Sequence, residues 1–149
     1  YIKTEQNKSR AIVVLDDDDT VAAGSSGLSI PLLGRIAAGS PILAEENIED
    51  YLTFPENMFG SGEYFALNVS GDSMIDGGIF DGDIAIIRKQ NTANNGEIIA
   101  ALLEDEATLK MFSKTGNAVK LVPMNKAYKP IERNDISILG KLAAVFRRY

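Results

Sequence analysis

Short apolar runs, separated by turn sequences, follow one another through most of the chain. Runs rich in Ile, Val, Leu, Tyr and Phe have the length and composition of β-strands. They predict seven strands, at residues 30–36, 64–70, 83–89, 97–103, 108–112, 119–122 and 136–146. Glycine-containing tripeptides predict tight turns at 81–83, 94–96 and 115–117. Because no long helical periodicity is present, the pattern predicts a compact, mostly-β domain, for which a barrel-like arrangement is one solution.

The beginning of the chain has a different pattern. Residues 9–15 form one further strand-like run, and residues 16–29 start with four aspartates followed by small residues. Such a stretch cannot bury a core, so we expect a flexible linker there. A lone strand before a linker indicates that its pairing partner lies upstream. We also expect one short helical turn, with proline at its first position, at residues 55–59.

Composition narrows the class of protein. The 149 residues are 45% hydrophobic, which suffices for one packed domain. No apolar run reaches the roughly 18 residues of a membrane span, and the first residues lack the apolar centre of a secretory signal. The complete absence of cysteine fits a reducing, cytoplasmic location.

The net charge of −6 argues against direct DNA binding by the main domain. Residues 1–15 carry +2, residues 16–19 carry −4, and the remainder carries −4. Duplex DNA requires lysine and arginine to neutralise its phosphates. We therefore expect any DNA contact to come from another segment.

Histidine and cysteine are both absent, which restricts the chemistry open to the chain. Without them there is no Ser-His-Asp triad, no thiolate nucleophile and none of the usual zinc ligands. We therefore expect no metal and no cofactor. For covalent acyl chemistry, a hydroxyl activated by a lysine is the main remaining arrangement.

Ser73 is the candidate nucleophile. It follows the apolar run 64–69 and comes two residues after Gly71, which relaxes the backbone where a strand ends. A sharp turn after a strand exposes a side chain and directs backbone N–H groups toward a developing oxyanion. A plain turn serine explains the same pattern.

Lys110 is the candidate base. It lies in the apolar run 107–112, and alternation along a strand places Thr108, Lys110 and Phe112 on one face. Burial would lower the pKa of the lysine and leave a neutral amine able to accept the Ser73 proton. A surface lysine is the alternative interpretation. Other lysines also stand in strand-like runs, namely Lys89, Lys120 and Lys141.

Three segments together resemble the LexA family of self-cleaving bacterial repressors. The first contains Ala37-Ala38-Gly39 and is similar to the family's cleavage region, where an Ala-Gly bond is cut. The second contains Ser-Gly-Asp-Ser-Met and is similar to the nucleophile segment, and the third is similar to the lysine strand. The three segments are residues 31–41, 69–74 and 106–110.

The order and spacing of these segments also match the family. Gly39 precedes Ser73 by 34 residues, and Lys110 follows it by 37. The resemblance covers roughly residues 30–149, and the first residues look like the last wing strand of a winged helix-turn-helix domain. Ser40 stands where the family often has glutamate, a departure that does not touch the Ser-Lys pair.

The resemblance implies a specific reaction. Ser73 Oγ would attack the Ala38 carbonyl of the same chain and cut the bond to Gly39. Uncharged Lys110 would take the hydroxyl proton and later pass one to the leaving amine. Backbone N–H groups around the serine, that of Met74 among them, would hold the oxyanion. The implied fold is the β-domain of LexA and signal peptidases, with a mobile cleavage loop.

The resemblance also implies an organisation and partners. Residues 1–15 would end a DNA-binding domain, 16–29 would be a linker, and 30–149 a self-cleaving, dimerising domain. The protein would repress transcription in the SOS DNA-damage response, bind operator DNA, and be inactivated when a RecA–single-stranded DNA filament favours loop docking. In a homodimer, the apolar run 136–146 would pair across the twofold axis. An internal central strand explains that run equally well.

Other functions share parts of this pattern. A UmuD-like polymerase accessory protein has the same Ser-Lys pair and self-cleavage without a DNA-binding domain, and the wing-like strand favours the repressor over it. A signal-peptidase-type enzyme acting on other chains needs a membrane anchor and no built-in Ala-Gly site. A non-catalytic β-domain would show no self-cleavage.

Overall fold

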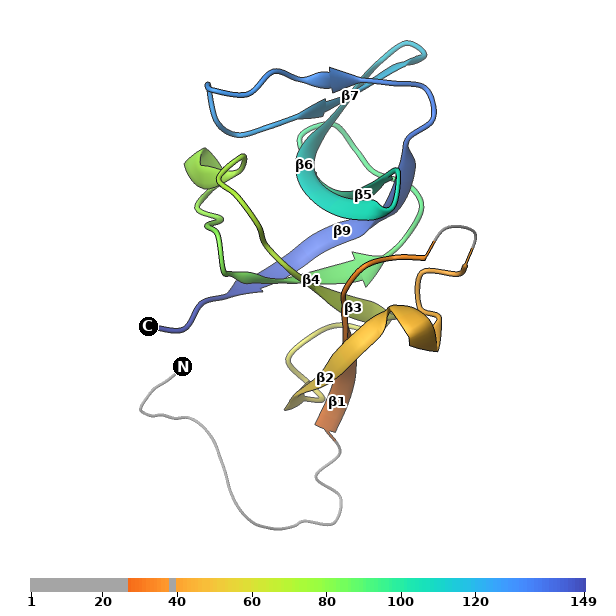
Figure 1. The fold of residues 1–149 in the computed structure, drawn as a ribbon, viewed down its shortest axis with the longest axis vertical. Coiled ribbons are helices and arrows are strands. Elements are labelled where there is room, and N and C mark those ends of the chain that lie inside the picture. The colour runs from red at the N-terminus through yellow and green to blue at the C-terminus, as the bar shows by residue number, and fades with distance from the viewer. Residues whose placement is uncertain (1–26, 38–39) are drawn as a thin grey trace. The chain divides into compact units, whose positions relative to one another are not determined.

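A computed structural model describes residues 27–37 and 40–149 (Figure 1). The strand predicted at 9–15 and most of the linker predicted at 16–29 lie outside the described residues, as do Ala38 and Gly39. Within the described residues, the regular structure consists of nine strands and two single turns of 3-10 helix. The mostly-β fold class is therefore confirmed.

The elements follow the apolar runs of the sequence. The strands are β1 Gly27–Leu33, β2 Ile48–Pro55, β3 Tyr64–Asn68, β4 Ile84–Lys89, β5 Ile98–Leu103, β6 Glu106–Thr115, β7 Ala118–Val122, β8 Ile131–Glu132 and β9 Ser137–Phe146. The two 3-10 turns are η1 Glu45–Asn47 and η2 Ile75–Gly77.

Each of the seven predicted runs coincides with a strand, although the ends differ. β1 begins at Gly27, so the last residues of the predicted linker belong to a strand. The predicted tight turns are confirmed, because their glycines have positive φ angles of 91°, 90° and 63° at Gly82, Gly96 and Gly116. The helical turn predicted at 55–59 is wrong, since one bond from the Met58 N–H to a carbonyl closes a turn that does not continue.

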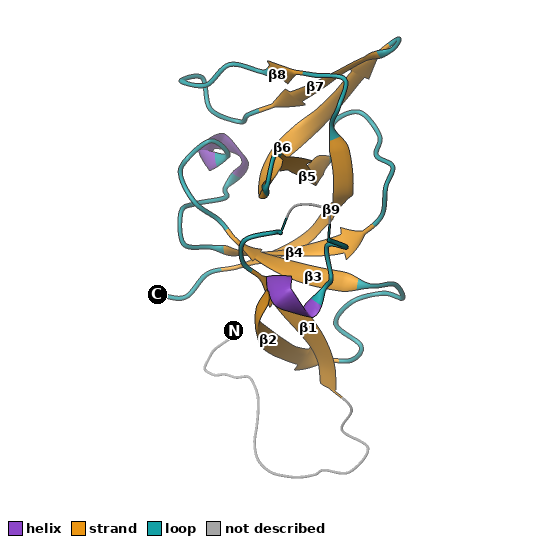
Figure 2. Ribbon diagram, turned by 45° about the vertical axis from the view of Figure 1, so that its right-hand side comes forward, coloured by secondary structure: helices purple, strands orange, loops and turns teal. Residues whose placement is uncertain are grey.

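The strands form a mixed sheet in the order β2-β1-β3-β4-β9-β5-β6-β7-β8. β1 and β3 run parallel, with Leu33 beside Leu67. β9 pairs with β5 along its first half and with β4 along its second, so it joins the two parts of the sheet (Figure 2). The run at 136–146 is thus internal in the sheet order. Its pairing across a dimer axis stays a prediction, because no contact within one chain tests it.

Residues 30–52 and 60–149 form one compact unit, and the site described below lies within it. In the other unit, the described residues are 27–29 and 53–59, where the rings of Phe54 and Phe59 meet edge to face at 5.7 Å. The main unit has a core that includes Phe65, Met74 and Leu109. Met74 and Leu109 adjoin Ser73 and Lys110 in the sequence, so the core anchors both candidate residues.

Candidate active site

Ser73 lies in the segment that follows β3. Gly71 has a φ of +81°, a left-handed conformation that lets the chain turn directly after the strand. Met74, the residue after the serine, is 2% exposed and packs in the core before η2 begins. The half-buried serine is therefore held between a turn and a buried anchor, and the predicted sharp turn after a strand is confirmed.

Lys110 lies in the middle of β6, a strongly curved strand that is paired on one side with β5 and on the other with β7 (Figure 1). This interior position buries the lysine, which is 8% exposed. The other lysines in strand-like runs, Lys89, Lys120 and Lys141, are exposed. Burial thus distinguishes Lys110, and of the two interpretations of its pattern the surface lysine is wrong.

The amine of Lys110 is in hydrogen-bond contact with the serine. Its Nζ lies 3.1 Å from Ser73 Oγ, 2.7 Å from Thr108 Oγ1 and 3.0 Å from the Leu109 carbonyl oxygen. Desolvation by burial lowers the pKa of Lys110 below its usual 10.5. A neutral amine has two N–H donors and one lone pair, which match two acceptors and the serine hydroxyl. The geometry therefore permits a proton to pass from Ser73 to Lys110.

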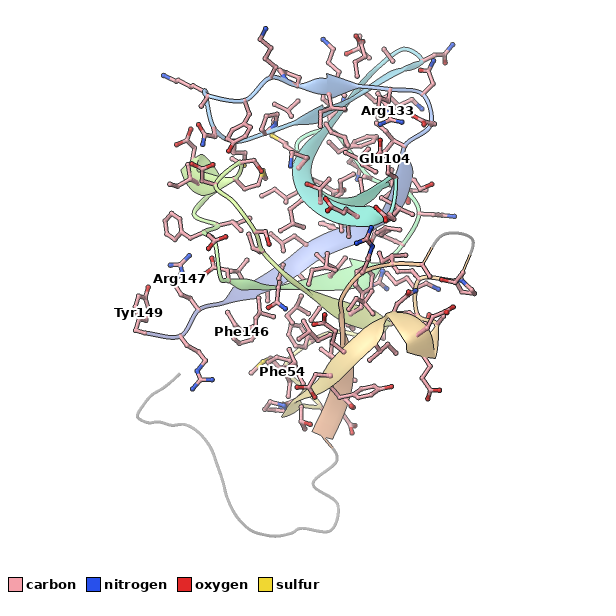
Figure 3. All side chains as sticks on the ribbon, in the orientation of Figure 1. Phe54, Glu104, Arg133, Phe146, Arg147 and Tyr149 are labelled. Carbon is pink, nitrogen blue, oxygen red and sulfur yellow. The ribbon has the colours of Figure 1, made fainter. Side chains whose placement is uncertain are left out.

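A buried carboxylate holds the far end of the segment that carries Ser73. Asp83, just before β4, is 1% exposed, and Arg147 donates to it from Nε at 2.7 Å and from Nη2 at 2.8 Å. Arg147 also donates to the Gly78 carbonyl and covers the Phe80 ring at 4.3 Å. Figure 3 shows Arg147 beyond the end of β9, next to this segment. The bond from Arg147 is the main cause that lowers the pKa of Asp83 below 3.8.

The residue before the serine is held by residues 124–128. Asn125 Nδ2 donates to the Asp72 carbonyl oxygen at 2.8 Å, and the Tyr128 hydroxyl donates to Oδ1 of the same aspartate. This hydrogen bond raises the pKa of Tyr128. No local sequence pattern marks these partners or Arg147, because their contacts join segments far apart in the chain.

A pocket of about 430 Å³ opens beside Ser73. Its lining comes from residues 33–35 at the end of β1, from Glu49 in β2, from 67–71 around the end of β3, and from 105–109 at the start of β6. This volume lies in the range of ligand-binding clefts. Among the hydrogen bonds between described residues, none is donated by the N–H groups of Ser73 or Met74. The site thus offers space and backbone donors next to the serine hydroxyl.

The predicted cleavage residues Ala38 and Gly39 lie outside the described residues, but their neighbours are described. Ser40 donates to the Ala37 carbonyl oxygen from its N–H at 3.3 Å and from Oγ at 2.9 Å. Neither Ala37 nor Ser40 lines the pocket at Ser73. The structure therefore brings Ser73 and Lys110 together and places the neighbours of the predicted bond outside that pocket.

Two further findings concern metals and membranes. In the part of the chain that the structure describes, no three His, Cys, Asp or Glu side chains are grouped to hold a metal ion. The helices of the same residues are two single 3-10 turns, far below membrane-spanning length.

Comparison with known proteins defines the class first. Residues 31–143 match the family described as Peptidase S24-like, so fold and match together define an S24-like peptidase domain. A LexA repressor of Leptospira biflexa is 51% identical over 151 residues, covering 100% of this chain and 74% of the relative. LexA repressors of Caldicellulosiruptor saccharolyticus and Moorella thermoacetica are 49% and 46% identical, over 99% and 100% of this chain and 72% and 73% of their own lengths. The chain belongs to the LexA repressor family.

Proposed function

We propose that this chain is a serine peptidase that cuts itself between Ala38 and Gly39, with Ser73 as nucleophile and Lys110 as general base. The observation that carries the proposal is the 3.1 Å contact between the buried Lys110 Nζ and Ser73 Oγ. With no histidine or cysteine in the chain, a hydroxyl activated by a lysine is the main arrangement left for covalent acyl chemistry. Membership of the S24-like peptidase family supports the same chemistry.

The reaction begins with attack of Ser73 Oγ on the carbonyl carbon of Ala38, while the hydroxyl proton passes to neutral Lys110. The tetrahedral intermediate then expels the Gly39 amine, which takes a proton from the lysine. Water releases the Ala38 carboxylate from the serine ester, with Lys110 accepting a proton and Ser73 regaining one. The two other hydrogen-bond partners of the lysine keep its amine oriented throughout.

Backbone donors complete the site. The N–H groups of Ser73 and Met74 hold the oxyanion, a role supported by the absence of other acceptors for them among the described residues. Because Met74 is fixed in the core, its N–H does not have to be reorganised during the reaction. The substrate belongs to the same chain, so the reaction has the high effective concentration of an intramolecular process.

Self-cleavage should accelerate with rising pH. The reactive form has an uncharged Lys110, and desolvation lowers the pKa of this group below 10.5, so the rate should reach half its plateau below that pH. The test is to incubate the chain over a series of pH values and to determine the masses of the products. We expect two fragments, residues 1–38 and 39–149.

Matched variants separate the proposed residues from their surroundings. Ser73→Ala and Lys110→Ala should each reduce the rate at least about a thousandfold, because the nucleophile or its base is lost. Lys120→Ala removes an exposed lysine from β7 and should leave the rate unchanged. An intact wild-type chain after prolonged alkaline incubation, or a cut at another bond, would contradict the proposal.

The biological role we infer is that of a cytoplasmic repressor in the SOS DNA-damage response. Residues 1–15 would end the DNA-binding domain, the linker predicted at 16–29 would end where β1 begins at Gly27, and the rest of the chain would form the self-cleaving and dimerising domain. The name borne by relatives at 46–51% identity supports this role. Cutting after Ala38 would separate the operator-binding part from the dimerising part. A RecA–single-stranded DNA filament would trigger the cut.

These partners can be tested directly. Addition of RecA filaments at neutral pH should accelerate the same cut that alkaline incubation produces, and no acceleration would contradict this trigger. The run 136–146, which contains β9, is the segment expected to pair across a twofold axis. Sedimentation should then show a dimer, and a monomer at every concentration would reject that assembly.

A further inference from the structure

The peptide bond between Asp72 and Ser73 has hydrogen-bond partners at one end and an available donor at the other. Its carbonyl oxygen, on Asp72, accepts from Asn125 Nδ2 at 2.8 Å and from the Ile75 N–H at 3.2 Å. Its N–H, on Ser73, takes part in no hydrogen bond between described residues. A carbonyl oxygen has two lone pairs, so this carbonyl is fully satisfied while the donor of the same peptide stays available.

The direction of the Ser73 N–H follows from what holds the carbonyl. A peptide bond is planar, and the described part of the chain has no cis bond, so C=O and N–H point in opposite directions. Asn125 lies on the carbonyl side, and the Ser73 N–H therefore points away from it. Hydrogen bonds accepted by a carbonyl also polarise the N–H of the same peptide and make it a better donor. An oxyanion is stabilised most by donors whose direction is set before the reaction.

Asn125 is itself held in one orientation. Its Oδ1 accepts from the Ala127 N–H at 2.9 Å. Because an N–H donates only to the oxygen of the amide, this bond turns Nδ2 toward Asp72. A backbone bond continues the attachment, since the Asp76 N–H donates to the Met124 carbonyl oxygen at 2.8 Å. The asparagine therefore has a fixed position against the turn that carries the serine.

Close packing supports the same attachment. A Cβ on Gly77 would lie 2.7 Å from Met124 Sδ, so a larger residue there would push the methionine away. Met124 also packs against the core cluster that contains Met74. The residue before Asn125 and the residue after Ser73 thus share one core, which keeps the two segments at a constant separation.

We propose that Asn125 is a positioning residue that aims the Ser73 N–H at the oxyanion during self-cleavage. The inference rests on the proposed function, because the oxyanion is the one formed when Ser73 attacks a carbonyl carbon. Without the Asn125 donor, the Asp72 carbonyl keeps the longer bond from Ile75. The peptide plane can then rotate, which turns the N–H away from the developing negative charge.

The test compares two substitutions that have one loss in common. Asn125→Asp keeps an oxygen for the Ala127 N–H but has no donor for Asp72, whereas Asn125→Ala loses both bonds. The plateau rate of self-cleavage at alkaline pH, followed by mass spectrometry of the full chain, should fall about tenfold in each variant. A misdirected donor loses part of the roughly hundredfold that a complete oxyanion donor contributes. The pH at half-maximal rate should not change in Asn125→Ala, because Lys110 is untouched.

Labelling of Ser73 by a fluorophosphonate gives a second readout that does not depend on the cleavage loop. The phosphoryl oxygen of the reagent takes the place of the oxyanion. The maximal labelling rate should therefore fall about as much as cleavage does, while the reagent concentration at half that rate stays within about twofold. Slow cleavage with wild-type labelling would place the defect in the substrate and overturn the proposal.

Asn95→Asp and Asn95→Ala are the matched controls. The Asn95 amide also accepts from a backbone N–H and donates to a carbonyl oxygen, both of Lys114. These bonds do not involve the segment that carries Ser73, so both substitutions should leave cleavage and labelling within about twofold. Thermal unfolding is followed for every variant. If one Asn125 variant unfolds below the assay temperature, the labelling of the other decides the question.

The outcomes separate the positioning role from the proposed function. Wild-type rates in Asn125→Asp, with slow reaction in Asn125→Ala, would reduce the asparagine to a residue that closes its own turn and would overturn the proposal. Equal losses in the Asn95 and Asn125 variants would overturn it as well. A wild-type chain that is neither cut nor labelled would instead reject the proposed function, and the positioning role with it.

Discussion

Two segments of the main unit are fastened in different ways. The segment that carries Ser73 is held at its far end by the buried Asp83 carboxylate and the Arg147 guanidinium, and near the serine by core packing of Met74. The loop at 34–47 is held by the neutral amide of Asn47. The first segment has a buried charged pair. The loop has a buried neutral amide, an exposed ion pair from Arg35, and apolar side chains that pack in or against the core, namely Ile36, Ile42 and Leu43.

The difference matches the tasks we propose for the two segments. Hydrogen bonds between charged partners are roughly twice as strong as neutral ones, and removing one partner of a buried pair leaves an unpaired charge. Neutral hydrogen bonds contribute about 1 kcal/mol each. A self-cleaving chain needs a nucleophile that stays in place and a substrate that moves. The buried charged pair lies on the segment of the proposed nucleophile, and the buried neutral amide lies on the loop of the proposed substrate.

Among the variants that test this difference between the two segments, Arg147→Ala should have the largest effect on stability. It should lower the midpoint of thermal unfolding by about 10 °C, because Asp83 would remain buried without its partner. Ser73 labelling should fall with it. Arg148→Ala, which removes the exposed neighbouring arginine, should change the midpoint by no more than about 1 °C. Equal midpoints for the two variants would show that the charged pair does not fasten the segment.

The second prediction concerns acid. The pKa of Asp83 is lower in the folded chain than its usual 3.8, chiefly through the bond from Arg147. Its contribution is therefore complete above that value and is lost as the pH falls through the folded pKa. Urea titrations at several pH values should show wild type more stable than Asp83→Asn near neutrality, with the difference shrinking in acid. Asp50→Asn removes an exposed carboxylate and serves as the control. If the difference in stability between wild type and Asp83→Asn did not change with pH, the ion pair between Asp83 and Arg147 would not stabilise the fold.

A smaller effect is expected from Tyr128→Phe. This change removes one exposed hydrogen bond to Asp72, next to the nucleophile, and leaves the rest of the segment in place. Self-cleavage and Ser73 labelling should both slow about threefold. Tyr51→Phe, at another exposed tyrosine, should slow neither. Unaltered labelling in Tyr128→Phe would show that the hydrogen bond from Tyr128 to Asp72 does not position the serine.

The smallest effect is expected from Arg35→Ala. Arg35 pairs with Asp105 at 2.8 Å, and this contact joins the start of the loop to the turn before β6. The arginine side chain is 82% exposed, and such surface pairs contribute little. The cleavage rate should stay within about twofold, as it should for Arg133→Ala, which breaks another exposed pair. A tenfold acceleration by Arg35→Ala alone would mean that the loop is also held by charge.

The hydrophobic pattern predicts the interior strands because a strand with neighbours on both sides is an apolar run. The two strands that it misses, β2 and β8, are at the two ends of the sheet order. A strand with one neighbour need not be apolar on both faces, and β2 contains Glu49, Asp50 and Thr53. β8 has two residues, and its conformation comes from pairing with β7. Such end strands form because the neighbouring strand offers hydrogen-bond partners, and their own sequence need not be an apolar run.

The sequence identifies Ser73 and Lys110 as candidates, but their contact depends on strand order. Lys110 lies opposite Ile99 of β5 and is 8% exposed, which a linear pattern does not show. Arg147 reaches an aspartate 64 residues away, so no local signal marks it. Asn47 lies ten residues from its Ala37 partner. An asparagine shortly after the Ala-Ala-Gly sequence is the one local signal for this contact.

The position of β9 in the sheet has a consequence for synthesis on the ribosome. Ser73 and Lys110 lie in parts of the sheet that β9 joins, yet β9 is translated after both of them. While residues 137–147 are still inside the exit tunnel, the sheet is interrupted and the Asp83 anchor has no partner. A nascent chain therefore contains Ser73 and Lys110 before the sheet that brings them together is complete.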